Sequence, residues 1–244
     1  MYRIGIDVGS TYTKYCIMQD NQIIDLFMEK TPIKQLEYFS EKVDFLREKY
    51  GNAAIVSCGY GKRNVDSIKN VNELTALAKG AYYIIGSSGV ILDIGGQDTK
   101  VIFQENGNLI HFFVNDKCAA GSGMFLSSVL NMLDKDFEMI DISNFKKCTG
   151  NLSSVCAVFA QSEIVNMIVD NMDPDAIINL VIKQILVKAK VVIDKVDTEK
   201  VYLTGGLSQI KGINAFASDV LGVECKEIRE GSYISAIGCA LLSR

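Results

Sequence analysis

The sequence is poor in the residues that most often define a catalytic centre. Its 244 residues include no tryptophan, two prolines and a single histidine, His111. A Ser-His-Asp triad or a histidine-ligated metal would have to depend on that one imidazole, so neither is favoured. The formal net charge is -4, and the basic stripe typical of nucleic-acid binding is absent. No apolar run approaches the ~18 residues of a membrane span, and no secretory leader precedes the first strand pattern. We therefore expect a cytoplasmic protein that binds neither nucleic acid nor membrane.

Cysteine is the residue type that needs an explanation. The chain has seven cysteines at irregular spacing. Disulfides are not expected in a cytoplasmic protein, so each cysteine is a small buried residue, a reactive thiol or a ligand. Four lie in apolar segments and are predicted to be buried: Cys16, Cys58, Cys225 and Cys239. The pattern around Cys148, Lys-Lys-Cys-Thr-Gly, does not indicate which of these roles Cys148 has.

One order of predicted elements occurs twice. Strands at 2–8, 13–19 and 22–29 precede a helix at 35–50, a strand at 53–58 and a helix at 72–83 capped by Asn72. Strands at 89–94, 99–104 and 109–114 then precede helices near 122–133, 157–171 and 174–194. A strand at 201–204, a helix at 213–221, a strand near Cys225 and a helix at 232–242 follow. Because internal repetition fixes architecture, we predict an α/β protein with two lobes and mixed sheets. Residues 1–86 would form the N-terminal lobe and 87–231 the C-terminal lobe, with the helix in 232–244 packing back on the first.

Two loops of similar composition end the first strand of each repeat: Asp7-Val-Gly-Ser-Thr-Tyr-Thr-Lys14 and Asp93-Ile-Gly-Gly-Gln-Asp-Thr-Lys100. Glycine lets backbone N–H groups approach a phosphate, hydroxyls add donors and lysine neutralises charge. A third turn, Gly205-Gly206, follows another apolar strand. The candidate nucleotide-binding residues are Gly9, Ser10, Thr11, Thr13, Lys14, Gly95, Gly96, Gln97, Gly205 and Gly206. One such loop would be a plain hairpin turn, but paired loops in matching places of a repeat favour a nucleotide site.

Side chains in these loops also suit hydrolysis. Asp7 can act on a water bound to Mg2+, an ion that keeps several waters and takes one or two carboxylates. Gln97 can orient the attacking water without acting as a strong base. The P-loop pattern Gly-x-x-x-x-Gly-Lys-Ser/Thr is absent. Over the whole chain these residues resemble the actin, Hsp70 and sugar-kinase superfamily. That resemblance implies two ribonuclease-H-like lobes with ATP in a cleft between them.

Two further cysteines precede predicted helices. Cys118 lies in Asn115-Asp-Lys-Cys-Ala-Ala-Gly-Ser-Gly123, and Cys156 lies in Ser153-Ser-Val-Cys-Ala-Val-Phe-Ala-Gln-Ser-Glu163. Helix N-termini carry unpaired N–H groups and partial positive charge, which stabilise a thiolate and any anionic cluster that it binds. A [4Fe–4S] cluster takes about four thiolates, so a symmetric homodimer would have to complete the set. On composition alone, two buried cysteines that cap helices are the simpler interpretation.

Both cysteine motifs and the second loop resemble the activators of 2-hydroxyacyl-CoA dehydratases and the ATPase subunits of benzoyl-CoA reductase. That family implies a homodimer with one [4Fe–4S] cluster between its subunits. Ferredoxin or flavodoxin supplies an electron, and ATP hydrolysis drives its transfer at very low potential to an iron–sulfur dehydratase or reductase. The resemblance implies ATP or ADP, Mg2+ and the cluster as cofactors. It also implies Cys118 and Cys156 as cluster ligands and places Gln97 and Asp98, with Asp7, among the catalytic residues.

The chain departs from the family pattern at the adenosine side and near the C-terminus. Leu77 stands where members carry a histidine, and the usual Gly-Gly-Val-Ala-x-Asn is Gly205-Gly-Leu-Ser-Gln-Ile210. The identity of the acceptor enzyme is therefore open, and a double-cubane cluster protein is one alternative. Two other functions stay open: a small-molecule kinase, which needs an aspartate base and a substrate pocket, and an actin-like assembly protein. The third alternative is a family member that binds nucleotide but has lost the cluster.

Overall fold

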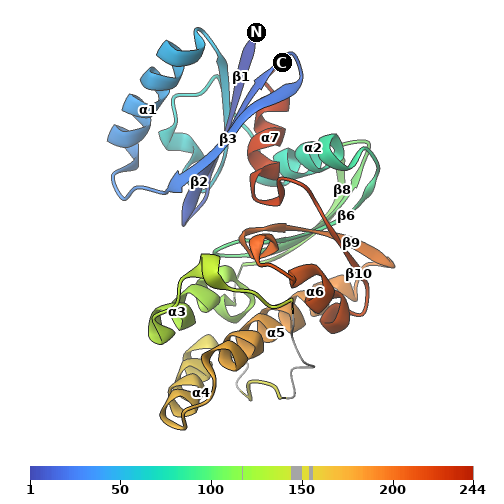
Figure 1. Ribbon diagram of the computed structural model, residues 1–244. Coiled ribbons are helices and arrows are strands. Elements are labelled where there is room, and N and C mark those ends of the chain that lie inside the picture. Colours follow the sequence, from blue (N-terminus) through green and yellow to red (C-terminus); the bar gives the residue numbers. More distant parts are fainter. Residues whose placement is uncertain (117, 144–149, 154–155, 244) are drawn as a thin grey trace. The chain divides into compact units, whose positions relative to one another are not determined.

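The computed structural model describes residues 1–116, 118–143, 150–153 and 156–243 (Figure 1). The strands are β1 (Tyr2–Val8), β2 (Tyr12–Gln19), β3 (Gln22–Lys30), β4 (Ala54–Gly59), β5 (Lys69–Asn70), β6 (Gly89–Ile94), β7 (Thr99–Glu105), β8 (Asn108–Asn115), β9 (Lys200–Gly205) and β10 (Glu224–Glu227). The α-helices are α1 (Gln35–Tyr50), α2 (Glu73–Ile85), α3 (Gly123–Leu133), α4 (Ala157–Val169), α5 (Pro174–Ile193), α6 (Ile213–Leu221) and α7 (Ile234–Leu241).

The chain divides into two compact units. The first comprises Met1–Gly89, Ile102–Phe112 and Ile228–Arg244, and the second comprises Val90–Val101 and Phe113–Glu227. The first hairpin loop therefore belongs to the first unit. The second hairpin loop and the segments around Cys118 and Cys156 belong to the second unit.

Two five-stranded sheets share one strand order. The first sheet runs β3-β2-β1-β4-β5, and the second, read from its far edge, runs β8-β7-β6-β9-β10. β1 pairs antiparallel with β2 and parallel with β4, while β9 pairs parallel with both β6 and β10. The predicted repeat, a three-strand meander followed by strand–helix units, is confirmed, and both sheets are mixed.

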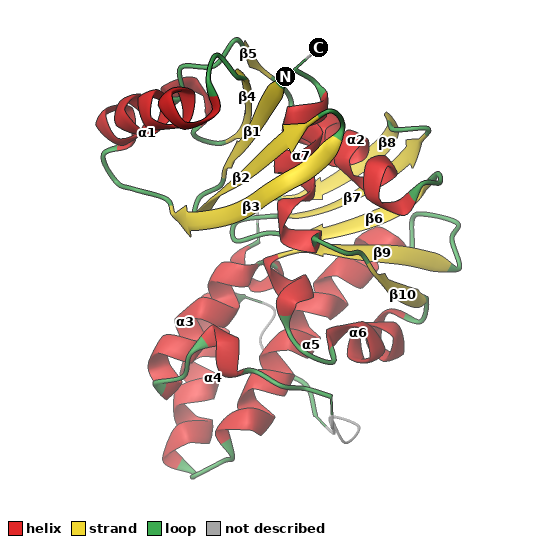
Figure 2. Ribbon diagram, turned by 45° about the horizontal axis from the view of Figure 1, so that its top comes forward, coloured by secondary structure: helices red, strands yellow, loops and turns green. Residues whose placement is uncertain are grey.

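In the first unit, α1 covers one face of the sheet (Figure 2). Alternate residues of β1, among them Ile4 and Ile6, are fully buried against Phe39, Val43 and Leu46 of α1. This is the period-two pattern of a strand meeting the apolar stripe of an amphipathic helix. The burial fixes the register of β1, because a shift by one residue would turn Ile4 and Ile6 away from the helix.

α2 and α7 pack on the other face of that sheet, and glycines allow them to approach closely. A Cβ on Gly5 of β1 would overlap the carbonyl of Ala236 in α7. A Cβ on Gly80 of α2 would overlap the carbonyl of Ile234, and one on Gly238 that of Ala76. The α2 helix begins at Asn72, whose side chain accepts a hydrogen bond from the Leu74 N–H at 2.8 Å, so the predicted cap is confirmed.

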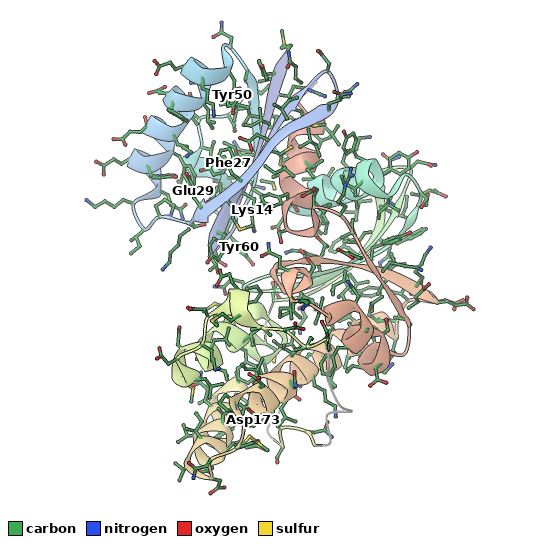
Figure 3. All side chains as sticks on the ribbon, viewed as in Figure 1. Lys14, Phe27, Glu29, Tyr50, Tyr60 and Asp173 are labelled. Atoms are coloured by element: carbon green, nitrogen blue, oxygen red, sulfur yellow. The ribbon has the colours of Figure 1, made fainter. Side chains whose placement is uncertain are left out.

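In the second unit, the 20-residue helix α5 is the central helix, and α3, α4 and α6 all contact it. Its apolar residues recur at helical spacing and are buried, as at Ile178, Ile182 and Ile185. Asp173 caps its start by accepting from the Asp175 N–H at 3.2 Å (Figure 3). Within the described residues, no helix combines the length and the apolar character that a bilayer crossing demands.

Candidate nucleotide and cluster sites

The first hairpin holds its aspartate and its lysine as an ion pair. Asp7 of β1 lies opposite Lys14 of β2, and the Lys14 Nζ is 3.3 Å from the Asp7 Oδ2 (Figure 3). The turn closes when the Gly9 N–H donates to the Tyr12 carbonyl at 3.2 Å. Asp7 is 6% exposed, and its other oxygen accepts from the Cys58 Sγ at 3.5 Å. The exposed side chains near the tip are Ser10, Thr11 and Tyr12.

The second hairpin repeats this arrangement with one more acid. The Lys100 Nζ lies 3.3 Å from the Asp93 Oδ2 and 2.6 Å from the Asp98 Oδ1. The turn closes through the Gly95 N–H, which donates to the Asp98 carbonyl at 2.9 Å. The Lys100 side chain is only 6% exposed, so both ion pairs are buried. Gln97 at the tip is exposed, whereas the Asp98 carboxylate is buried against Lys100.

A glycine on the neighbouring parallel strand faces each aspartate. Gly59 of β4 pairs with Val8, and Gly205 of β9 pairs with Ile94. Both glycines have positive φ, +87° and +84°, and a Cβ on either would overlap the carbonyl of its strand partner. That Cβ would also lie 2.8 Å from an Asp7 oxygen or 2.7 Å from an Asp93 oxygen. Sequence reasoning missed Gly59, although its place after an apolar strand matches that of Gly205.

Thr13 and Gly206 occupy different surroundings from those of the loop tips. Thr13 is fully buried, and its hydroxyl lies 3.0 Å from that of Thr31. The Thr31 hydroxyl in turn donates to the Gly9 carbonyl at 2.8 Å. Thr13 therefore supports the first loop through Thr31. Gly206 is exposed, and a Cβ there would meet no atom within 4 Å.

Cys118 and Cys156 are the described cysteines that solvent reaches. Cys118 precedes the short 3-10 turn Ala119–Gly121 and its carbonyl accepts from the Gly121 N–H at 3.0 Å. Cys156 is the N-cap of α4 and its carbonyl accepts from the Ala160 N–H at 2.9 Å. Cys118 is partly exposed and Cys156 is exposed. The interpretation that both are buried is therefore wrong. α4 leaves Cys156 open because it buries only Ala160 and Ile164.

The remaining described cysteines are buried, as predicted: Cys16, Cys58, Cys225 and Cys239. Burial, and then the neighbouring Cys239 thiol, raises the pKa of Cys16 to about 12. Burial and the same neighbour also raise the pKa of Cys58 well above its ordinary value. The thiols of Cys16 and Cys58 are poor ligands at neutral pH because they resist ionisation. Cys148 lies outside the described residues.

The donor set suits a cluster shared between chains. In the part of the chain that is described, no three His, Cys, Asp or Glu side chains gather as a metal site. Two accessible thiols at helix starts fall short of the ~4 thiolates that a [4Fe–4S] cluster takes. A second copy of the chain would bring the same two thiols, so the residues present fit a cluster on a two-fold axis.

Residues of the Cys156 motif hold that segment in place. The Glu163 carboxylate accepts from the Ser153 N–H at 2.9 and 3.0 Å and from the Ser153 hydroxyl at 3.1 Å. The Gln161 Nε2 donates to the Ser128 Oγ of α3 at 2.7 Å. Sequence reasoning did not assign these roles, because partners 10 and 33 residues apart leave no local pattern.

The second hairpin loop is hydrogen-bonded to the start of α3. The Gly95 carbonyl accepts from the Gly123 N–H at 2.8 Å, and the Gly96 carbonyl accepts from the Met124 N–H at 2.9 Å. The Thr99 hydroxyl donates to the Gly121 carbonyl at 2.6 Å. The loop and the turn that begins at Cys118 therefore form one hydrogen-bonded body within the second unit.

Solved structures define the class of fold. A ROK family glucokinase from Streptomyces griseus aligns with 99% of this chain and 99% of its own, with a TM-score of 0.59 at 12% identity. That likeness concerns the fold alone. The activator of the 2-hydroxyisocaproyl-CoA dehydratase from Clostridium difficile, solved with bound ADPNP, aligns with a TM-score of 0.89 at 30% identity. It covers 100% of this chain and 94% of that one. The predicted α/β fold of the actin-like ATPases is confirmed.

Sequence comparison then gives the family. The (R)-2-hydroxyglutaryl-CoA dehydratase activating ATPase of Acidaminococcus fermentans is 34% identical over 254 residues, which cover 99% of this chain and 96% of the relative. Residues 4–243 match the BadF/BadG/BcrA/BcrD ATPase family. The chain belongs to this family of ATPases, and its relatives include activators of 2-hydroxyacyl-CoA dehydratases.

Proposed function

We propose that this protein hydrolyses ATP to drive the transfer of one electron to an iron–sulfur 2-hydroxyacyl-CoA dehydratase or a related reductase. The observation that carries the proposal is the direct hydrogen bonding between the second phosphate loop and the segment that begins at Cys118. A loop that binds nucleotide and a thiol that holds a redox group would then share one rigid connection. Phosphorylation of a small substrate would need no such connection.

Each hairpin offers groups of the kind that bind the phosphates of a nucleotide. The backbone of Gly9, Gly95 and Gly96 offers N–H groups at turns, and the exposed Ser10 and Thr11 offer hydroxyl donors. Lys14 adds positive charge beside Asp7, and Gly205-Gly206 would lie along the nucleotide. Asp7 would act on a Mg2+-bound water, and the exposed Gln97 would orient the attacking water. Asp98 would hold Lys100 beside the second loop and so fix the local charge.

Cys118 and Cys156 would hold a [4Fe–4S] cluster together with the same two residues of a second copy. When bound, the cluster supplies a one-electron carrier. Cys156 caps the start of α4, where the partial positive charge of a helix N-terminus would favour an anionic cluster. The apolar side chains Val158, Phe159 and Val169 of α4 are 68%, 68% and 70% exposed. An apolar surface on the helix that Cys156 caps supports a homodimer, because such patches are usually covered by a partner.

The overall step balances as one electron passed and one phosphoanhydride bond broken. A reduced ferredoxin or flavodoxin loses an electron, the acceptor enzyme gains it, and ATP with water becomes ADP and phosphate. Coupling requires ATP to bind one conformation more tightly than ADP does, since a ligand with equal affinity for two states shifts neither.

Anaerobic iron analysis combined with ATPase assays tests this proposal. We expect Cys118→Ser protein to lose most of its iron and its brown colour. Cys225→Ala, which alters a buried cysteine of β10, should keep both. Gln97→Ala should keep its iron but slow hydrolysis by roughly 100-fold, the scale of a lost positioning group. Full iron in Cys118→Ser would remove the cluster assignment, and unchanged hydrolysis in Gln97→Ala would remove the catalytic one.

A further inference from the structure

We infer that Thr99 and Gln161 are positioning residues that carry the nucleotide state of the second phosphate loop to Cys118 and Cys156. The inference rests on the proposed function and deepens it by naming the side chains that connect its two sites. All the contacts involved lie within the second unit.

Thr99 connects the loop to the turn after Cys118. It is the first residue of β7 and is 1% exposed, and its hydroxyl donates to the Gly121 carbonyl at 2.6 Å. The turn has little room to move independently, because a Cβ on Gly121 would meet the side chains of Asn115 and Lys188 at 3.1 Å. A shift of the hairpin would therefore move the turn, and Cys118 at its start, in the same direction.

The start of α3 is attached to the loop at two further points. The N–H groups of Gly123 and Met124 donate to the carbonyls of Gly95 and Gly96. A Cβ on Gly123 would lie 3.0 Å from the Gly95 carbonyl oxygen, so glycine is what lets the helix come this close. When the Gly95–Gly96 backbone turns toward or away from a phosphate, these carbonyls must turn with it. The helix start must follow or lose both bonds.

Gln161 passes the displacement from α3 to α4. Its Nε2 donates to the Ser128 Oγ at 2.7 Å. Ser128 lies in α3, five residues after Gly123. Cys156 caps the start of α4, and Glu163 holds Ser153 ahead of it. α4 is lightly packed, since Ala160 and Ile164 are its buried residues. One polar contact can therefore govern the position of the Cys156 helix start relative to α3.

The first hairpin provides the matched control. Thr13 holds the place of Thr99 in the repeat, because each lies immediately before the lysine that pairs with the strand aspartate. The Thr13 hydroxyl meets Thr31 within the first unit and reaches neither cysteine segment. Thr31→Val thus removes this contact from the Thr31 side, without touching the connection or a candidate nucleotide-binding residue.

The experiment measures alkylation of the two thiols in the full-length chain after its iron has been removed anaerobically. Iodoacetamide labelling of Cys118 and Cys156 is followed by peptide mass spectrometry with Mg2+ and either ADPNP or ADP. We expect the labelling rates to differ between the two nucleotides by about fivefold, a common size of coupling between sites. Thr99→Val should bring the ratio to about 1 at both cysteines, while Thr99→Ser and Thr31→Val should keep it. Gln161→Met should abolish the ratio at Cys156 and keep it at Cys118.

Two outcomes overturn the inference. One is a ratio that stays unchanged in Thr99→Val, or unchanged at Cys156 in Gln161→Met. The other is a wild-type ratio of about 1 although ADPNP binds. Gln161→Met alters a partly exposed contact, so it keeps the test decisive even where Thr99→Val fails to fold. Neither outcome depends on iron. Iron content and ATP hydrolysis measured separately show whether the proposed function itself has failed.

Discussion

The two hairpins share one internal construction and differ in what they are attached to. Each sets a strand aspartate against a lysine 7 residues later, with a positive-φ glycine beside it on the parallel neighbour. The first loop is tied to Thr31, in the connection after β3, whereas the second is tied to Gly121, Gly123 and Met124. A duplicated fold can thus keep the same hairpin construction twice and still attach the two copies to different segments. The attachments outside the loop decide which copy connects to the cysteines.

The largest expected effect separates the two lysines. Lys100→Met leaves Asp93 and Asp98 as buried carboxylates without the ammonium that they share, and breaking such a buried pair costs about 3–5 kcal/mol. Lys14 is 23% exposed and meets one carboxylate, so water can partly replace it in Lys14→Met, and we expect a loss of about 1 kcal/mol. Urea unfolding of both variants measures the difference. Equal losses would show that Asp98, the extra acid of the second hairpin, does not make the stability of the protein more dependent on Lys100.

The next effect should be equal in the two hairpins. Gly59→Ala and Gly205→Ala each force a Cβ against a strand carbonyl at positive φ. We expect a loss of about 3 kcal/mol in both, because backbone strain at positive φ and overpacking add. Gly86→Ala is the control, since Gly86 has a φ of +74° but open space around it, so strain of about 1 kcal/mol acts alone. A large loss in one glycine variant and a small loss in the other would break the equivalence of the hairpins.

Local patterns made most of the fold predictable. The bounds of α1 and α6 follow directly from helical spacing, and Asn72 follows from cap chemistry. The paired loops could be recognised because each is a short hairpin whose glycines and hydroxyls are adjacent in sequence. β5 could not be predicted, because its two residues, Lys69 and Asn70, are too few to show a period.

Long-range contacts account for what the sequence did not reveal about the site. The burial of Thr13 depends on Thr31, 18 residues away, and the role of Thr99 depends on a carbonyl 22 residues away. Neither contact leaves a spacing that a single sequence displays. The exposure of Cys156 likewise follows from how little of α4 is packed, which is a tertiary property.

The smallest expected effect concerns the response to acid of β3, the edge strand beside the first hairpin. Glu29 of β3 lies opposite Thr13 and accepts hydrogen bonds from the Tyr38 hydroxyl and from the Lys42 Nζ, the latter at 2.6 Å (Figure 3). Burial raises the pKa of Glu29, but the bonds from Lys42 and Tyr38 outweigh it and leave that pKa below its ordinary value of 4.5. A carboxylate whose pKa is depressed on folding adds stability above the unfolded pKa. That stability is lost as the pH falls through the folded value.

Glu29→Gln should therefore destabilise the protein at pH 7 by about 0.5 kcal/mol, a small value because the side chain is partly exposed. The gap between wild type and variant should close as the pH falls below the ordinary pKa of 4.5, because wild-type Glu29 then becomes neutral too. Urea unfolding midpoints of the two proteins, measured in parallel from pH 7 downward, test this directly. A gap that stays constant with pH would mean that Glu29 supports the first hairpin through packing, and that its charge contributes nothing.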